Sequence, residues 1–125
     1  MPIRDGTSVN RADVFSASCP SRHALELVAN KWTLLIVQAL RSGAMRNGEL
    51  MRKLEGISQK VLTQTLRELE RNGLIDRIDH SIKALHVDYR LTTLGASLSE
   101  ALITVDQWVE THHAELPRRS QSIDP

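Results

Sequence analysis

The stretch from Ser58 to Gly73 constrains the fold most strongly, because it has the pattern of an amphipathic helix with both ends marked. Apolar residues recur along it on one helical stripe, namely Val61, Leu62, Leu66 and Leu69. Ser58 can accept hydrogen bonds from the first free amides of a helix, and Gly73 can adopt the left-handed conformation that ends one. A helix with such a stripe must bury it, so the rest of the chain has to supply a core.

The opposite face of this predicted helix is polar and basic, with no acid before Glu68. Its members are Ser58, Gln59, Lys60, Thr63, Gln64 and Arg67. These side chain types can hydrogen-bond to base edges and phosphates, and an α-helix fits the major groove of B-form DNA. An ordinary solvated face would have the same composition, so the helix alone leaves both interpretations open.

Composition indicates one small globular domain with an aliphatic core. The chain has 125 residues, of which 41% are hydrophobic but only 3% aromatic, which favours a mainly helical protein. No apolar run approaches the ~20 residues of a membrane span, and residues 1–17 are too polar for a signal peptide. We therefore expect a cytoplasmic protein with no membrane contact.

The formal net charge of +1 conceals an uneven distribution along the chain. Residues 41–90 hold ten Lys and Arg against seven Asp and Glu, whereas residues 92–116 hold four acids and no Lys or Arg. A weak total charge argues against binding by bulk electrostatics, but a local basic surplus is sufficient for a site-specific nucleic-acid binder.

The first half of the chain predicts three helices before Ser58. One begins at Cys19-Pro20 with a buried face of Leu25, Leu27 and Val28, and the next, over residues 31–43, is apolar nearly all round and therefore central. A short third helix is expected over residues 48–54, capped by Asn47. The connection 55–57 then leads to Ser58, and a short helix, a tight turn and a longer helix form a helix-turn-helix signature.

After Gly73 the apolar period changes to two, which predicts a β-hairpin. Residues 74–78 and 85–91 form its strands and residues 80–84 its turn. Its cationic or titratable side chains are Arg77, His80, Lys83, His86 and Arg90. A hairpin directly after the polar-faced helix is the arrangement of a winged helix, whose wing can reach phosphates or the minor groove. A solvated hairpin with ordinary surface charge is the alternative.

A last long helix is expected from Thr92 or Thr93 to about Glu115. Its apolar stripe is longer than a small core can cover, so a second copy is the simplest partner, and we assign the interface to Leu98, Leu102, Val105, Trp108 and Val109. The fold class is thus mainly α (α+β), a winged helix-turn-helix with a C-terminal dimerisation helix. We expect this domain over residues 19–115, between a flexible arm at 1–18 and a flexible tail at 116–125.

An ordered set of short motifs covers about three quarters of the chain. The motifs are Cys19-Pro20, Lys31-Trp32-Thr33-Leu34-Leu35-Ile36, Gly48-Glu49-Leu50, Gly56-Ile57-Ser58, Leu66-Arg67-Glu68-Leu69-Glu70, Gly73-Leu74-Ile75, Tyr89-Arg90-Leu91-Thr92, Gly95 and Trp108. In these the chain resembles the HxlR-type regulators, a winged-helix family near the MarR group. The resemblance implies a homodimeric transcription factor, commonly a repressor of a palindromic operator, with Ser58 to Arg67 in the major groove and the hairpin beside it. It implies double-stranded DNA as the partner and no cofactor.

Cys19 has two interpretations. Several members of the HxlR-type family carry a thiol at this position that senses quinones, aldehydes or oxidants, and the helix N-terminus with Arg22 and His23 nearby favours a thiolate. Alternatively, Cys19 is a small buried apolar plug, as most free cysteines are. Since the chain has one cysteine, a sensor would act through alkylation, a mixed disulfide or a link between subunits.

Two other classes of function fit the sequence less well. An enzyme is disfavoured because no catalytic or nucleotide-binding motif is present, and adjacent His112 and His113 point about 100° apart on a helix, which makes a poor metal chelate. We expect no metal site. A winged helix that only binds proteins is the second alternative, and the acid-free front of the Ser58 helix argues against it.

Overall fold

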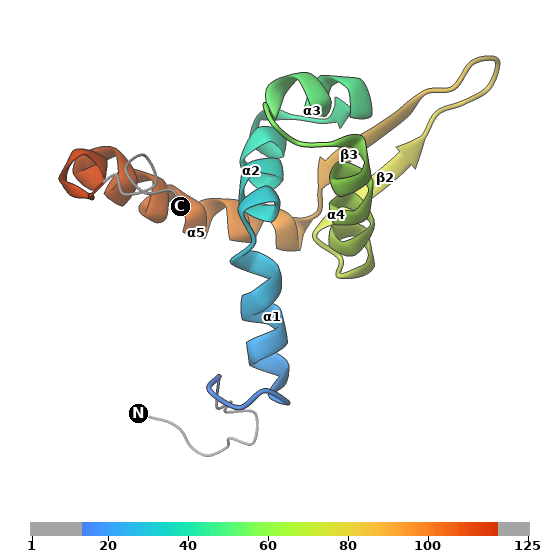
Figure 1. Ribbon diagram of the computed structural model, residues 1–125. Helices are drawn as coiled ribbons and strands as arrows, with labels where there is room; N and C mark the ends of the chain where they lie inside the picture. The colour runs from blue at the N-terminus through green and yellow to red at the C-terminus, as the bar shows by residue number, and fades with distance from the viewer. Residues whose placement is uncertain (1–13, 118–125) are drawn as a thin grey trace.

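The computed structural model describes residues 14–117, so most of the expected arm and tail lies outside the described residues. The elements in chain order are α1 (Pro20–Val28), α2 (Lys31–Ala39), the 3-10 helix η2 (Leu40–Ser42), β1 (Met45–Arg46), α3 (Asn47–Lys53), α4 (Gln59–Arg71), β2 (Ile75–Asp79), β3 (Val87–Leu91), α5 (Thr93–His112) and the 3-10 helix η3 (His113–Glu115). A mainly helical fold with a small antiparallel sheet confirms the predicted winged helix-turn-helix (Figure 1).

The core lies between α2, α3, α4 and the start of β2. Its fully buried aliphatic side chains are Ile36, Val37, Leu50, Leu62, Leu69 and Ile75. The predicted stripe of α4 is confirmed, since Leu62, Leu66 and Leu69 are all buried and Val61 is half-buried against them. Helix α2 is central as expected, because it contacts each of the other four α-helices.

Local capping explains most helix ends. The Ser58 hydroxyl accepts from the Val61 amide at 3.1 Å, and Gly73 has a φ of +76°, as predicted for the two ends of α4. Asn47, predicted to cap α3, is instead its first helical residue. The cap is Arg46, whose amide donates to the Glu49 carboxylate at 2.8 Å, because Arg46 is held extended by its pairing in β1.

The sheet has the strand order β1-β3-β2, with all pairs antiparallel. Strand β1, which was not predicted, pairs Met45 with Tyr89 and so ties the start of α3 to the hairpin. The second hairpin strand was predicted to begin at Leu85, but Leu85 is 83% exposed in the loop and β3 begins at Val87. The His80 amide donates to the His86 carbonyl at 2.7 Å and closes the loop there.

Helix α1 projects away from the body of the chain, as Figure 1 shows. The predicted buried face of this helix is wrong for the single chain. No residue of α1 is buried, and Leu25 is 51% exposed. The physical reason is that α1 reaches the body only near its end, so most of its apolar face extends past the core.

Helix α5 is anchored at its start and projects at its end. The Thr92 hydroxyl caps it by accepting from the Gly95 amide at 3.0 Å. Arg41 fixes its middle, donating to the Ser99 hydroxyl at 2.7 Å and the Ser99 carbonyl at 3.1 Å. Leu102, expected in the dimer interface, is only 6% exposed and is thus covered by its own chain. None of the helices in the described part of the chain is long and apolar enough to cross a bilayer.

Candidate nucleic-acid interface

A pair of side-chain amides fixes the corner between α3 and α4. Asn47 Nδ2 donates to Gln59 Oε1 at 2.8 Å, and Gln59 Nε2 donates back to Asn47 Oδ1 at 2.9 Å. Gln59 Nε2 also donates to the Thr63 hydroxyl at 2.9 Å. Of the predicted DNA-binding residues, Gln59 therefore links α4 to α3, whereas Ser58 and Thr63 make hydrogen bonds within α4 and its cap.

The remaining predicted residues of α4 are exposed. Lys60, Gln64 and Arg67 lie on its solvent side, and within residues 14–117 no hydrogen bond or ion pair holds their polar ends. The acids of α4 lie in its second half, where Glu68 pairs with Arg71 at 2.6 Å. The first half of α4 thus presents donors that are available to an external acceptor.

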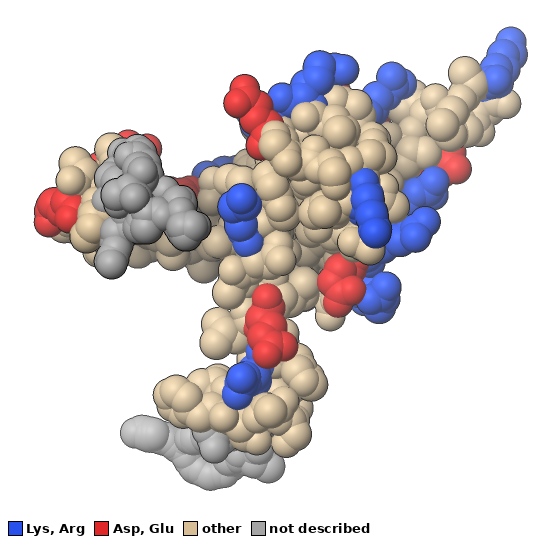
Figure 2. All heavy atoms as spheres, in the orientation of Figure 1, with Lys and Arg blue, Asp and Glu red and all other residues tan. Residues whose placement is uncertain are grey.

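Helix α4 and the hairpin share one surface. A polar hollow of about 220 Å³ lies between them, lined by Thr63, Leu66, Arg67, Glu70, Arg77 and Tyr89. Arg67 of α4 and Arg77 of β2 therefore face the same space, although they are ten residues apart. Figure 2 shows Lys and Arg side chains over this side of the molecule and out to the hairpin tip.

Some of the cationic side chains of the hairpin are engaged in ion pairs and others are not. Arg90 lies 3.9 Å from Asp76 on the neighbouring strand, whereas Arg77 and Lys83 make no ion pair within the described chain. At the loop, the Ser81 amide donates to Asp79 Oδ1 at 2.8 Å, and the hydrogen bonds from Ser81 hold the pKa of Asp79 below its ordinary value. The hairpin thus offers Arg77 and Lys83 as its unengaged cations.

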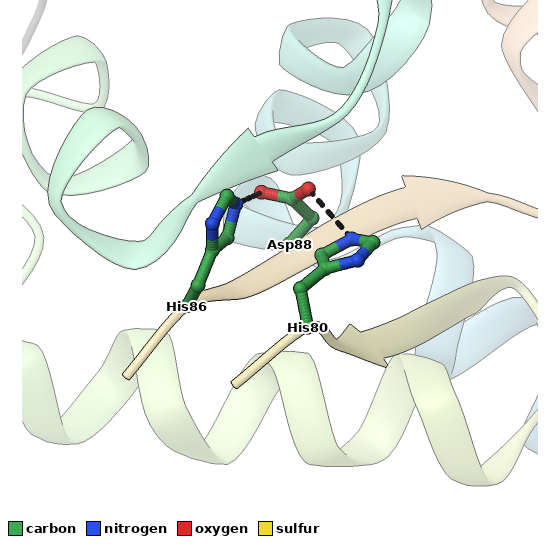
Figure 3. A group of neighbouring side chains, drawn as sticks. All are labelled: His80, His86 and Asp88. Carbon is green, nitrogen blue, oxygen red and sulfur yellow. Dashed lines mark ion pairs between the residues drawn. The ribbon is translucent and has the colours of Figure 1, made fainter. Parts of the chain in front are cut away.

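His80, a predicted DNA contact, belongs to a cluster that the sequence interpretation missed. His80 Nε2 lies 3.1 Å from Asp88 Oδ2, and His86 Nε2 lies 3.4 Å from Asp88 Oδ1. Figure 3 shows the carboxylate between the two imidazole rings. The cluster could have been predicted only from the strand register, because His80 and His86 lie opposite each other one step beyond the Asp79–Val87 pair.

Cys19 lies at the N-terminal end of α1 as its N-cap, with Pro20 next to it in the helix. The predicted position at a helix start is therefore correct, but the side chain is only 8% exposed. The nearby Arg22 guanidinium donates to the Phe15 carbonyl at 3.1 Å and lies 3.6 Å from Glu26. The Cys19 thiol is therefore largely covered in the single chain.

The second half of α5 carries the exposed part of the predicted interface. Val105, Trp108 and Val109 are 49%, 52% and 45% exposed. Leu98 is half-buried against the core, so it has less surface to offer than these three. Leu94 and Ile103 of α5 are also exposed, and neither was assigned to the interface. Leu94, at the start of the helix, lines an apolar groove with Leu27 and Val28 of α1.

Comparisons with known proteins agree with this arrangement. The HxlR-like helix-turn-helix family matches residues 27–116. The chain is 38% identical over 108 residues to the HTH-type transcriptional regulator YtfH of Escherichia coli, covering 86% of each. It resembles the solved structure of the regulator ytfH from Salmonella typhimurium with a TM-score of 0.77 and 36% identity, over 84% of this chain and 94% of that one.

A second solved relative has been determined both in a reduced form and with quinone bound. The reduced form of the transcriptional regulator YodB from Bacillus subtilis matches with a TM-score of 0.66 and 31% identity, over 74% of this chain and 91% of that one. YodB has also been solved with quinone bound, and that form matches with a TM-score of 0.62 and 30% identity.

Proposed function

The chain belongs to the HxlR-like helix-turn-helix family of transcriptional regulators, and from this premise we propose that it is a homodimeric repressor that binds a palindromic operator. In this proposal Lys60, Gln64 and Arg67 of α4 enter the major groove. Arg77 and Lys83 of the hairpin contact the flanking phosphates. The main support for this proposal is the exposed first half of α4, which has no acid. Within residues 14–117, the side chains of Lys60, Gln64 and Arg67 have no hydrogen-bond or ion-pair partner.

The apolar surface that one chain leaves exposed supports a dimer. Leu25 of α1 and Val105, Trp108 and Val109 of α5 lie outside the core, on the two helices that project from the body (Figure 1). A second copy related by two-fold symmetry would cover both helices with the same residues. Such a dimer would present two α4 helices to half-sites about 34 Å apart, which is one turn of duplex.

Base contacts by α4 can be tested by fluorescence anisotropy with a duplex selected by the protein from a random pool. We expect Gln64→Ala with Arg67→Ala to weaken binding at least tenfold, because a good bidentate contact contributes about 1–3 kcal/mol. The matched control is Arg71→Ala, which removes a cation of the same helix that is already paired with Glu68. If the double variant binds the duplex with unchanged affinity, Gln64 and Arg67 of α4 do not make the base contacts.

The dependence of DNA affinity on salt concentration distinguishes a DNA-binding protein from a winged helix that binds only proteins. Replacing Arg77 and Lys83 by Ala should weaken binding to all sequences alike and make the dependence of affinity on salt less steep, because fewer phosphate counterions are released. A chain that selects no duplex at low salt would instead support the protein-binding alternative.

We further propose that Cys19 makes DNA binding responsive to electrophiles. Three observations support this role: the helix start, the neighbouring Arg22 and His23, and a relative solved with quinone. Because Cys19 is buried, we expect modification to disturb the packing at the start of α1, a helix that we place in the proposed dimer surface. Diamide or a quinone should release the wild-type chain from DNA and leave Cys19→Ser bound. Equal release of both chains would remove the sensor role.

A further inference from the structure

The His80, His86 and Asp88 side chains form a compact set of metal-type donors at the base of the hairpin loop. One donor atom from each lies within 4.8 Å of the others. They come from three separate positions, since His80 follows β2, His86 precedes β3 and Asp88 lies within β3. We call these three residues the wing triad.

The backbone under the wing triad is fixed by hydrogen bonds. Asp79 pairs with Val87 at the end of the ladder, and the His80 amide donates to the His86 carbonyl at 2.7 Å. The Ser81 hydroxyl accepts from the His86 amide at 2.9 Å. The backbones of His80 and His86 are therefore held opposite each other by the register of the sheet, which reduces the conformational entropy that a ligand would have to remove.

The spacing of the donors suits a tetrahedral ion. Two ligands at about 2.0–2.1 Å from a zinc ion, at tetrahedral angles, lie about 3.3 Å from each other. The His80 Nε2–Asp88 Oδ2 distance of 3.1 Å and the His86 Nε2–Asp88 Oδ1 distance of 3.4 Å are close to this value. Because they involve different oxygens of the carboxylate, one ion would bind after a small rotation of the side chains or by using both oxygens. The larger separation between the rings can close by rotation, because the His80 and His86 side chains are 48% and 42% exposed.

From this geometry we propose that the wing triad binds one divalent transition-metal ion of the zinc class, with water completing the coordination. Two imidazoles and one carboxylate are donors that zinc, nickel and copper accept, whereas calcium and magnesium prefer oxygen alone. In the structure both imidazoles lie within ion-pair distance of the Asp88 carboxylate. A bound ion requires unprotonated imidazole nitrogens, so metal binding competes with protons there.

The bound ion would join the ends of β2 and β3 and add up to two positive charges to the hairpin, on the face opposite to Arg77. This consequence rests on the proposed function: a stiffer and more positive hairpin should bind DNA phosphates more tightly. Metal binding itself is independent of DNA and is measured without it. Failure of DNA binding and failure of the metal site are therefore separate results.

Isothermal titration of the untagged full-length chain with zinc chloride tests the site. We expect one ion per chain, and binding weaker by more than about tenfold in His80→Ala and in His86→Ala, since even loss of an outer-shell partner can cost 10- to 100-fold. The matched control is His112→Ala with His113→Ala, which removes the other neighbouring histidine pair and should leave binding unchanged. Binding that survives either wing variant, or that is lost in the control, would overturn the proposal.

A measurement on the wild-type chain guards against variants that fail to fold. Zinc should shift the imidazole nitrogen signals of His80 and His86 in NMR spectra and leave the other three histidines unchanged. Cobalt in place of zinc should give a visible spectrum without a thiolate charge-transfer band, because no cysteine is in the wing triad. A thiolate band would assign the ion to Cys19, and the absence of any imidazole shift would show that the triad does not bind.

Discussion

At the scale of single residues, Gly95 fixes the position of α5 against the hairpin. A Cβ at this position would collide with the Leu74 carbonyl oxygen and lie 3.1 Å from Leu91 Cδ2. That carbonyl also accepts from the Thr92 amide at 3.1 Å, so it cannot move without losing a bond. We expect Gly95→Ala to lower the free energy of unfolding by about 2–3 kcal/mol, as overpacking of a core does, in urea denaturation.

The matched control for this prediction is Gly48→Ala in α3. A Cβ on Gly48 would meet only Arg52 Nη1 at 3.6 Å, which is an ordinary contact. The change should be neutral or stabilise by up to about 1 kcal/mol, because alanine loses less backbone entropy than glycine in a helix. Equal stability of the two variants would mean that α5 can shift away from Leu74 at little cost.

The sequence predicts single residues well where their role depends on local chemistry. Ser58, Thr92 and Gly73 were assigned correctly because a cap or a left-handed residue acts within one turn of the chain. Asp88 was missed because its position between two histidines depends on the register of β2 and β3. Arg46 was missed as a cap because its extended conformation depends on pairing with Asp88 across β1 and β3.

At the scale of elements, the amide pair Asn47–Gln59 sets how α3 and α4 meet. Each single change to alanine should cost about 1 kcal/mol of stability, since it breaks the bonds between the two helices. Because both changes break the same bonds, the double variant should cost less than their sum by at least about 0.5 kcal/mol. Denaturation of the four chains of this cycle measures that coupling.

Gln64 supplies the control for this cycle. It lies on the same helix and is exposed, and within the described residues its amide has no hydrogen-bond partner. Asn47→Ala combined with Gln64→Ala should therefore be additive within error. Additivity in the Asn47 and Gln59 cycle as well would show that the amide pair does not stabilise the corner in solution.

Element prediction succeeded where one face of an element is buried in its own chain. The stripe of α4 has that property, so its periodicity identified both the helix and its buried side. The two-residue strand β1 is too short to show a period, and its pairing with β3 is long-range. The periodicity of α1 did predict an apolar face, but it could not indicate whether the same chain covers that face.

At the scale of the whole molecule, the two helices that project from the body leave apolar residues exposed, and the proposed dimer would cover them. Trp108 is the largest of these residues and packs against His112 in a tilted arrangement with ring centroids 4.8 Å apart. We expect Trp108→Glu to shift the chain from dimer to monomer in sedimentation experiments, because a carboxylate would be buried in the apolar interface without a partner. DNA affinity should fall with it, since a monomer binds only one half-site.

The chain offers a matched control for this last prediction in Ile82→Glu. Ile82 is 91% exposed at the tip of the hairpin loop, so the change has the same chemistry at a position outside the proposed dimer surface. It should leave the dimer intact, and the thermal stability of this variant should still rise with protein concentration, as it does when folding and association are coupled. The Trp108→Glu chain should lose that concentration dependence. If the Trp108→Glu chain remains a dimer, the interface does not lie at the end of α5. The exposed Leu25 of α1 is then the next contact to test.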